Sequence, residues 1–311
     1  AMAGWGFRYI PQQFMPLLNK QYFSVDMWLP EGTRIEESEK QAAQLTEYLQ
    51  TFDGVKKVST YIGQTPPRYY LANAAYGPQP NYAQCLIEAD TPEKSRELQE
   101  ILYHKLPEKF QDALIRVNSF EINSIPQALI EARFCGDDPA VLDSLTNIAI
   151  GIMRKNPKVL NARNEWGNMA MMIKAGYDPV KAGRLNIGRS DMMNAVKSVS
   201  DGTAIGIYRD NDKKVPVLLR TKEEASWDTE KMEDLQIWNG SNSAPLGQVT
   251  DGINIAWEYP LVRTYNRQLS MAAQCDVKRG HTMKEVHAEI REEIENIKLP
   301  EGYSFFLGFT I

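Results

Sequence analysis

The sequence lacks a long hydrophobic run and an excess of positive charge. No stretch approaches the roughly 20 consecutive apolar residues that span a bilayer, so the sequence as given predicts a soluble chain without a transmembrane helix. The formal net charge is -5, whereas nucleic-acid-binding proteins usually carry a basic footprint. We therefore expect no nucleic-acid partner. The contents of 43% hydrophobic and 24% charged residues are ordinary for a globular protein.

Cysteine and histidine are also scarce. Cys85, Cys135 and Cys275 each fall in a predicted strand, and no CxxC or zinc-like spacing occurs. We expect small buried thiols. Met169 and Met171 alternate along a predicted strand, which favours packing over soft-metal binding. The sequence predicts no metal site.

The motifs of common enzyme classes are absent. There is no P-loop, GxGxxG fingerprint, GxSxG elbow or HExxH sequence. The sequence therefore predicts no cofactor and no enzymatic activity. It favours a binding or interaction protein.

A strand–helix–strand pattern occurs four times along the chain. Two such units side by side form a ferredoxin-like βαββαβ sandwich. The first two units are nearly contiguous, whereas residues 169–266 separate the third from the fourth. We expect an α+β protein with two ferredoxin-like sandwiches, the second interrupted by an inserted α+β subdomain.

Several helix starts are marked by capping residues. Thr33 with Glu36 and Thr282 with Glu285 have the spacing of capping boxes. The other predicted caps are Thr91 before Pro92, Asp138 before Pro139, Asp178 before Pro179, and Ser190.

Within the insert, the sequence predicts a strand, two helices, a hairpin and a short helix. The hairpin turns at Asn211 and Asp212. The segment "GSNSAPLGQV", residues 240–249, is expected to be a loop because it is rich in Gly, Ser and Asn.

The first strand, "FSVDMWL", carries two kinds of residue in alternation. Side chains of one parity, from Phe23 to Leu29, are apolar, and those of the other are Ser24, Asp26 and Trp28. The apolar parity is expected to pack under helices.

The chain begins with an apparent cloning scar, Ala1-Met2-Ala3, followed by the aromatic segment "GWGFRYIPQQFMP". Aromatic clusters of this kind occur at membrane interfaces. An arm packed on the surface of the domain explains the segment equally well.

From Phe14 onward the chain resembles the second large periplasmic loop of resistance–nodulation–division (RND) efflux pumps of the AcrB/AcrD/AcrF type. The resemblance rests on the order and spacing of "FMP", "LPEGT", "GVKKVSTYIGQTPPRYYL", "IEARFCGDD", "RLNIGR", "GRSDMMNAVKSVSDGTAIGIY", "APLGQV" and "LPEGYSF". In such pumps this loop lies between the seventh and eighth membrane helices. The resemblance implies a membrane-exit arm at 1–19, a first porter subdomain at 20–122, a second at 123–167 with 264–311, and a docking subdomain at 168–263.

The resemblance also implies a function. The chain would be the periplasmic substrate-capturing and docking portion of a proton-driven multidrug transporter in a bacterial inner membrane. Amphiphilic small molecules would pass through a cleft between the porter subdomains. The full-length pump would be a homotrimer that works with a periplasmic adaptor protein and an outer-membrane channel.

In such pumps the open sheet faces of the two sandwiches oppose each other across the cleft. The resemblance therefore places the second parity of the first strand in the cleft, together with residues of the facing sheet and of the loop after Gly63. The implied substrate-binding residues are Asp26, Trp28, Ser59, Tyr61, Arg68, Tyr69, Tyr70, Glu131, Arg133 and Arg163.

The resemblance has departures, and other functions stay open. The loop after Gly63 is rich in proline and tyrosine, whereas the best-known drug exporters have phenylalanine and glycine there. Heavy-metal exporters use a methionine trio in the cleft, but Met27 lies on the buried parity, which favours drug-like substrates. The main alternative is a stand-alone small-ligand-sensing protein with ferredoxin-like modules; an enzyme is a weaker one.

Overall fold

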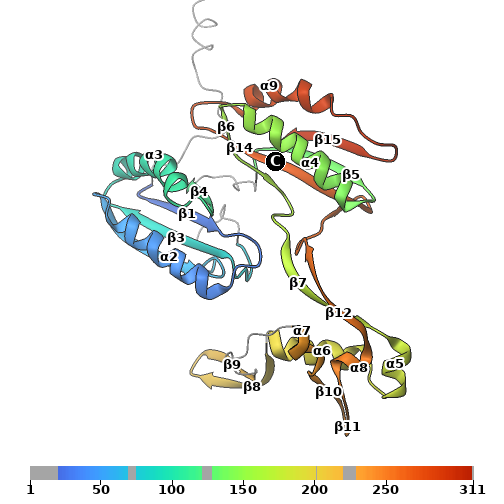
Figure 1. Cartoon of the computed structure of the whole chain (residues 1–311). Coiled ribbons are helices and arrows are strands. Elements are labelled where there is room, and N and C mark those ends of the chain that lie inside the picture. Colours follow the sequence, from blue (N-terminus) through green and yellow to red (C-terminus); the bar gives the residue numbers. More distant parts are fainter. Residues whose placement is uncertain (1–19, 69–74, 121–127, 201, 220–228, 310–311) are drawn as a thin grey trace, which may run out of the picture. The chain divides into compact units, whose positions relative to one another are not determined.

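The computed structural model describes residues 20–68, 75–120, 128–200, 202–219 and 229–309. The aromatic N-terminal arm lies outside the described residues. The chain forms two compact units: one comprises residues 1–169 with 259–311, and the other comprises Ala170–Glu258. The chain combines helices with antiparallel sheets (Figure 1), and the prediction of an α+β protein is confirmed.

The first sheet of the larger unit has four strands in the order β2-β3-β1-β4. Two helices connect strands of this sheet: one lies between β1 and β2 in the chain, and the other between β3 and β4. The elements are β1 (Tyr22–Trp28), α2 (Ile35–Gln50), β2 (Val55–Ile62), β3 (Tyr82–Ala89), α3 (Pro92–Lys109) and β4 (Leu114–Ser119).

Both helices cover one face of this sheet. Phe23, Val25 and Met27 of β1 are fully buried in one cluster with Leu45 of α2 and Leu102 of α3. Alternation along β1 therefore directs its apolar parity towards the helices. The other face of the first sheet carries no helix from this layer, and we call it the helix-free face.

The second sheet of the larger unit joins strands from both sides of the smaller unit. β5 lies between β14 and β15, while β6 and β13 pair with β14. Its elements are β5 (Ile130–Gly136), α4 (Pro139–Lys155), β6 (Val159–Asn164), β13 (Thr264–Tyr265), β14 (Gln268–Val277), α9 (Met283–Glu295) and β15 (Ser304–Phe309).

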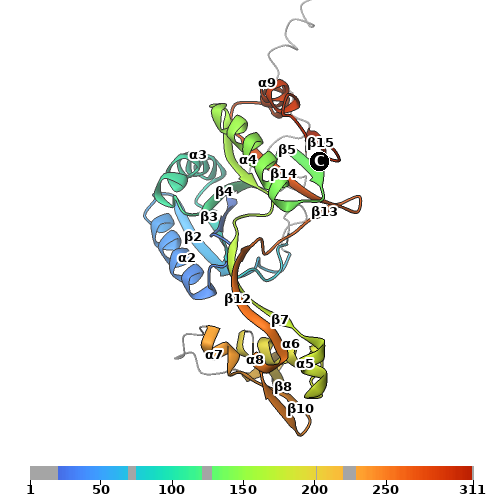
Figure 2. The same cartoon turned by 45° about the vertical axis from the view of Figure 1, so that its right-hand side comes forward.

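Two helices, α4 and α9, cover one face of the second sheet (Figure 2). Their apolar stripes share a core with Phe134 of β5 and Met271 of β14. Trp166 closes one end of this core: its indole N–H donates to the Ser270 carbonyl oxygen at 2.8 Å, and its ring meets that of Tyr259 edge-on at 5.3 Å. The opposite face is again free of these helices.

Four of the predicted helix caps are confirmed, with side-chain oxygens accepting backbone N–H groups. Asp178 accepts from the Val180 N–H at 2.8 Å. Thr91 accepts from Lys94 at the start of α3 at 3.2 Å, and Thr282 accepts from Glu285 at 3.3 Å. Asp138 accepts from the Ala140 N–H at 2.8 Å. Each contact satisfies one of the N–H groups that a helix start leaves without a partner in the helix.

Two predicted caps are wrong. α2 begins at Ile35 after Arg34, which makes no capping hydrogen bond, and the Thr33 hydroxyl donates to the Pro30 carbonyl oxygen at 2.6 Å instead. The chain turns at Thr33 before entering the helix, so the capping box with Glu36 does not form. Ser190 is also no cap, because α6 already begins at Arg189.

The smaller unit falls within the segment 168–263 that the sequence assigned to the insert. The long antiparallel pair β7–β12 begins and ends it, and an exposed hairpin turns at Asn211, which has φ of 53°. Its elements are β7 (Ala170–Tyr177), α5 (Pro179–Arg184), α6 (Arg189–Ser200), β8 (Thr203–Asp210), β9 (Lys213–Leu219), α7 (Thr229–Glu233), β10 (Gln236–Asn239), β11 (Asn242–Pro245), α8 (Leu246–Val249) and β12 (Thr250–Glu258).

The prediction of a loop over 240–249 is wrong. Asn242–Pro245 pair with β10, and the one-turn helix Leu246–Val249 follows directly. Leu246 and Val249 are fully buried in the core of the smaller unit. Burial of these two side chains explains the order of a segment whose composition is typical of a loop.

No helix among the described residues is long and apolar enough to cross a bilayer.

Candidate functional site

The helix-free face of the first sheet carries polar and aromatic side chains. Because side chains alternate along a strand, Ser24, Asp26 and Trp28 of β1 lie on this face, opposite to the apolar parity. Asp26 is the register partner of Gln84 in β3 and of Arg116 in β4. Register partners lie on the same face, so these three side chains lie together.

Asp26 is the centre of a buried hydrogen-bond network and is only 4% exposed. Its Oδ1 accepts from the Tyr82 hydroxyl at 2.9 Å and from Gln84 Nε2 at 2.7 Å, and its Oδ2 accepts from Asn118 Nδ2 at 2.5 Å. Burial raises the pKa of Asp26 above its ordinary value, and the three hydrogen bonds and the charge of Arg116 oppose this shift. The carboxyl group holds three side chains in place.

Three aromatic rings adjoin this network. Trp28 lies 5.2 Å from Tyr82 and 5.6 Å from Tyr76 between ring centroids, and the two tyrosine rings are 5.3 Å apart. Rings at such spacing combine apolar faces with polar edges and hydroxyl groups. The cluster can therefore contact both parts of an amphiphilic molecule.

Of the predicted residues of β2, Tyr61 is the register partner of Gln84 and so lies beside this network. Ser59 and Tyr61 are half-buried on the helix-free face, as their register with β3 requires. Arg68 is exposed. Tyr69 and Tyr70 lie outside the described residues.

The helix-free face of the second sheet carries a network of charges. Arg133 makes two bonds of 3.0 Å to the Glu165 carboxylate, and its Nε donates to Glu131 at 3.0 Å. Gln274 donates to Glu131 at 3.2 Å, and Arg263 forms an ion pair of 3.1 Å with Glu165. Burial alone would lower the pKa of Arg133, but its carboxylate partners raise it overall. The predicted residues Glu131 and Arg133 are therefore bound to each other.

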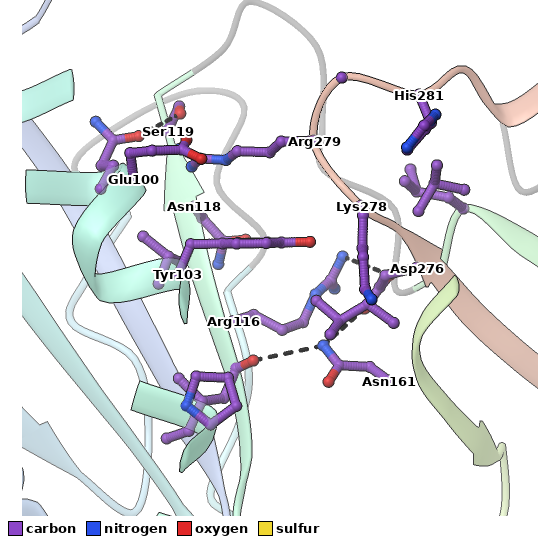
Figure 3. Close-up of a pocket in the computed structure, with 18 of the residues that line it drawn as sticks. Glu100, Tyr103, Arg116, Asn118, Ser119, Asn161, Asp276, Lys278, Arg279 and His281 are labelled. Carbon is purple, nitrogen blue, oxygen red and sulfur yellow. Dashed lines mark hydrogen bonds and ion pairs between the residues drawn. The ribbon is translucent and has the colours of Figure 1, made fainter. Parts of the chain in front are cut away.

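The two sheets meet at a buried carboxylate, Asp276 of β14. Its carboxylate accepts a hydrogen bond of 3.2 Å from Arg116 of the first sheet. It also accepts hydrogen bonds of 3.2 and 3.3 Å from Asn161 and Arg163 of the second sheet (Figure 3). We call these four residues the Asp276 cluster. Burial lowers the pKa of Arg163, an effect that the nearby charge of Arg116 reinforces and that of Asp276 opposes. Arg163 thus takes part in the contact between the sheets.

A cavity lies on each side of this cluster. The first, with a volume of about 650 Å³, is lined by α3, β4 and the segment 276–283 (Figure 3), and we call it the α3 cavity. The second has about 490 Å³ and is lined by Trp28, Tyr76 and Arg163 among others; we call it the Trp28 cavity. Arg116 lines both.

Only two of the predicted site residues that the structure describes line these cavities. Trp28 and Arg163 line the Trp28 cavity. The others lie elsewhere on the helix-free faces or on the exposed loop, and they line neither cavity: Asp26, Ser59, Tyr61, Arg68, Glu131 and Arg133.

Among the described residues, no group of three or more His, Cys, Asp and Glu side chains is arranged to hold a metal ion. Cys85 and Cys275 are buried, and Cys135 is partly exposed. Burial raises the pKa of Cys275 to about 12, so this thiol keeps its proton at neutral pH. Met27 lies in the core under the helices.

The comparison with protein families bears on the whole chain. The model of the AcrB/AcrD/AcrF family matches residues 1–309. The chain belongs to the AcrB/AcrD/AcrF family. This result confirms the resemblance to RND efflux pumps that the sequence motifs indicated.

The solved structures with a similar fold are described as a pump. A structure described as a heavy metal efflux pump, crystal form I, superposes with a TM-score of 0.75 at 14% identity, covering 97% of this chain and 32% of that chain. Its crystal form II gives a TM-score of 0.71 at 14% identity, covering 94% and 31%. This AcrB/AcrD/AcrF-family chain thus spans about a third of these proteins, and the likeness concerns the fold. No curated protein matches the sequence.

Sequence reasoning missed several residues at the contact between the sheets of this AcrB/AcrD/AcrF-family chain. Arg116, Asp276, Tyr103 and Lys278 were not singled out, although all line the α3 cavity. A signal existed for two of them, because Arg116 stands between Ile115 and Val117, and Asp276 between Cys275 and Val277, each a charged residue between apolar ones along a strand. No such pattern marks Lys278, which follows the strand.

Proposed function

We propose that this chain is the periplasmic substrate-capturing and docking portion of an RND efflux transporter. It handles amphiphilic small molecules without chemical conversion. In this proposal the two helix-covered sheets are ferredoxin-like porter sandwiches, at 20–122 and at 123–167 with 264–311. The segment 168–263 is the inserted docking subdomain.

One observation carries the proposal. Side chains from the helix-free faces of both sheets line the same two cavities, on either side of the Asp276 cluster. Sheet faces that were only solvated surfaces would not be expected to line common cavities. Ligand sites typically combine apolar and aromatic walls with a few fixed polar groups.

The Trp28 cavity supports the amphiphilic class of substrate. Trp28 and Tyr76 supply aromatic surface, while Arg116 and Arg163 supply fixed positive charge. Aromatic rings contact varied apolar groups without a fixed hydrogen-bond pattern. The structures of similar fold are described as a heavy metal efflux pump, and soft metal ions prefer sulfur ligands, but Met27 lies in the core under the helices.

The assembly follows from family membership as part of the same proposal. The full-length protein is a homotrimer in a bacterial inner membrane, and this portion faces the periplasm. A periplasmic adaptor and an outer-membrane channel receive the substrate. The membrane portion supplies the energy of proton flow.

The test uses the full-length pump in an efflux-deficient bacterial strain. Trp28→Ala should raise the accumulation of an amphiphilic fluorescent dye several-fold, because truncation removes the central ring of the cavity wall. Tyr61→Ala, on the same face but outside both cavities, should have a smaller effect. Protein level and trimer assembly are measured in parallel.

Two outcomes would count against the proposal. If Trp28→Ala changed dye accumulation only in proportion to protein level, Trp28 would be a packing residue. If the intact pump lowered cellular copper or silver but left dye accumulation unchanged, the cargo would be a metal ion. Elemental analysis of the cells distinguishes that result.

A further inference from the structure

The α3 cavity is basic, although the chain as a whole is acidic. Five of its lining side chains are positively charged and two are negatively charged, in a chain of formal net charge -5. The positive side chains are Lys20, Arg96, Arg116, Lys278 and Arg279. A concave surface lined by one sign of charge concentrates ligands of the opposite sign.

The two carboxylates of the cavity already have basic partners. Glu100 receives Arg279 at 2.9 Å and lies 3.4 Å from His104. Asp276 is shared within its cluster by Arg116 and Arg163. The acidic groups therefore serve to hold basic side chains in the wall of the cavity.

A buried hydroxyl group points to a ligand independently of the charge. The Tyr103 hydroxyl is buried and has no hydrogen-bond partner among the described residues. Burial raises the pKa of Tyr103, and the Arg279 backbone N–H near the hydroxyl oxygen opposes this shift. An N–H group can only donate, so the hydroxyl proton is still without an acceptor. A buried donor without an acceptor costs free energy, which an anionic oxygen would recover.

The geometry brings these groups together. Figure 3 shows Tyr103 of α3 extending into the cavity towards the side on which Lys278 and Arg279 lie. The Arg279 guanidinium lies over the Tyr103 ring, 5.2 Å from its centroid. One hydroxyl donor and two basic side chains thus border the same space.

The remaining wall is apolar. Val117 of β4 and Leu160 and Val277 of the second sheet line the cavity and are partly exposed, whereas Ile115 is only 4% exposed in the core of the first sheet. The three partly exposed side chains cannot hydrogen-bond to a solvated anion, but they can cover an alkyl chain. The cavity therefore offers two different environments to one ligand.

We propose that the α3 cavity binds an anionic amphiphile, with its anionic head at Lys278, Arg279 and the Tyr103 hydroxyl and its alkyl tail along Val117, Leu160 and Val277. This inference rests on the proposed function, because it names the class of amphiphile that the pump captures. The Asp276 cluster separates this site from the Trp28 cavity.

The test compares head groups on one alkyl chain. Isothermal titration of the 311-residue protein uses decyl sulfate, decyl maltoside and decyltrimethylammonium below their critical micelle concentrations, together with inorganic sulfate. Decyl sulfate should bind about tenfold more tightly than decyl maltoside, as one or two charge-assisted hydrogen bonds imply. Raising the salt concentration should weaken decyl sulfate binding alone.

Two variants and a control locate the site. Lys278→Gln and Tyr103→Phe should each weaken decyl sulfate binding several-fold and leave decyl maltoside binding unchanged. Tyr103→Phe should lower the stability of the unliganded protein little, because the hydroxyl proton has no acceptor to lose. Lys57→Gln, an exposed lysine on β2 that lines neither cavity, should change nothing.

Each other outcome overturns the inference in a distinguishable way. Equal binding of all three decyl compounds would leave the proposed function standing and remove the anion preference. Inorganic sulfate binding as tightly as decyl sulfate would remove the role of the apolar wall. A protein that bound none of the decyl compounds would contradict the proposed function as well.

Discussion

Asp26 illustrates how far a single residue can be predicted from its neighbours in sequence. Alternation along β1 was enough to place it on the face opposite to Phe23 and Val25. Its burial could not be predicted, because Tyr82, Gln84 and Asn118 reach it from two other strands. The sequence pattern indicates the face of a sheet and carries no information on which strands pair beside it.

The raised pKa of Asp26 predicts a pH dependence of stability. The folded state holds this proton more tightly than the unfolded state, so stability is lost as the pH rises from the ordinary carboxyl range through the raised pKa. Asp26→Asn cannot titrate. Its free energy of unfolding, relative to wild type, should therefore increase across this pH window in urea titrations. A difference that stayed constant or fell with pH would show that Asp26 is not shifted in this direction.

Trp166 predicts a large loss of stability on truncation. It is 1% exposed and donates to the Ser270 carbonyl oxygen. Trp166→Ala should cost about 3–5 kcal/mol of unfolding free energy through lost burial and the cavity left behind. Trp238, 63% exposed, is the control, and Trp238→Ala should stay within about 0.5 kcal/mol. Urea denaturation of both variants by circular dichroism compares them.

At the scale of elements, the long amphipathic segments were predictable and the short ones were not. α4 was expected from its Asp138-Pro139 start and from repeated apolar residues, and the structure has it over Pro139–Lys155. β11 and α8 were missed because each has only four residues. So short a segment does not show the two-residue period of a strand or the 3.6-residue period of a helix clearly enough to distinguish it from a loop. Tertiary burial orders them.

The two threonines at the starts of α3 and α2 give a matched test of capping. Thr91 caps its helix through the Lys94 N–H, whereas Thr33 bonds only to a turn carbonyl. Thr91→Ala should cost about 1 kcal/mol of stability. Thr33→Ala should cost less than half of that in the same thermal or urea melts. Equal losses would mean that capping does not account for the effect of Thr91.

At the scale of the whole molecule, sequence patterns could not predict the contact between the two sheets. The Asp276 cluster joins Arg116, Asn161 and Arg163 to a strand more than a hundred residues later in the chain than any of them. Local periodicity cannot report such a pairing. The family resemblance implied that two sheet faces oppose each other, but it did not indicate that Arg116 and Asp276 join them.

The register of β7 and β12 predicts that the larger unit folds without the smaller one. Ala170 is the register partner of Glu258, and such partners have Cα atoms about 5 Å apart. Replacing residues 171–257 by Asn-Gly should therefore close a hairpin and leave the larger unit folded. The blue-shifted fluorescence of buried Trp166 and cooperative unfolding should persist.

The control deletion removes residues 165–262 with the same turn and so also removes Trp166. It should unfold at lower urea concentration than the shorter deletion. If the shorter deletion itself abolished cooperative unfolding, the two units would not be independent.

The central place of β5 has a consequence for synthesis on the ribosome. Both strands that pair with β5, β14 and β15, begin only at residues 268 and 304. At roughly 5–20 residues per second, translation from the end of β5 at Gly136 to the start of β14 at Gln268 takes about 7 to 26 seconds. During this interval both edges of an apolar strand await their partners, while residues 22–119 already contain every strand of the first sheet. Nascent chains stalled in this interval are therefore the ones that we expect to need chaperone protection most.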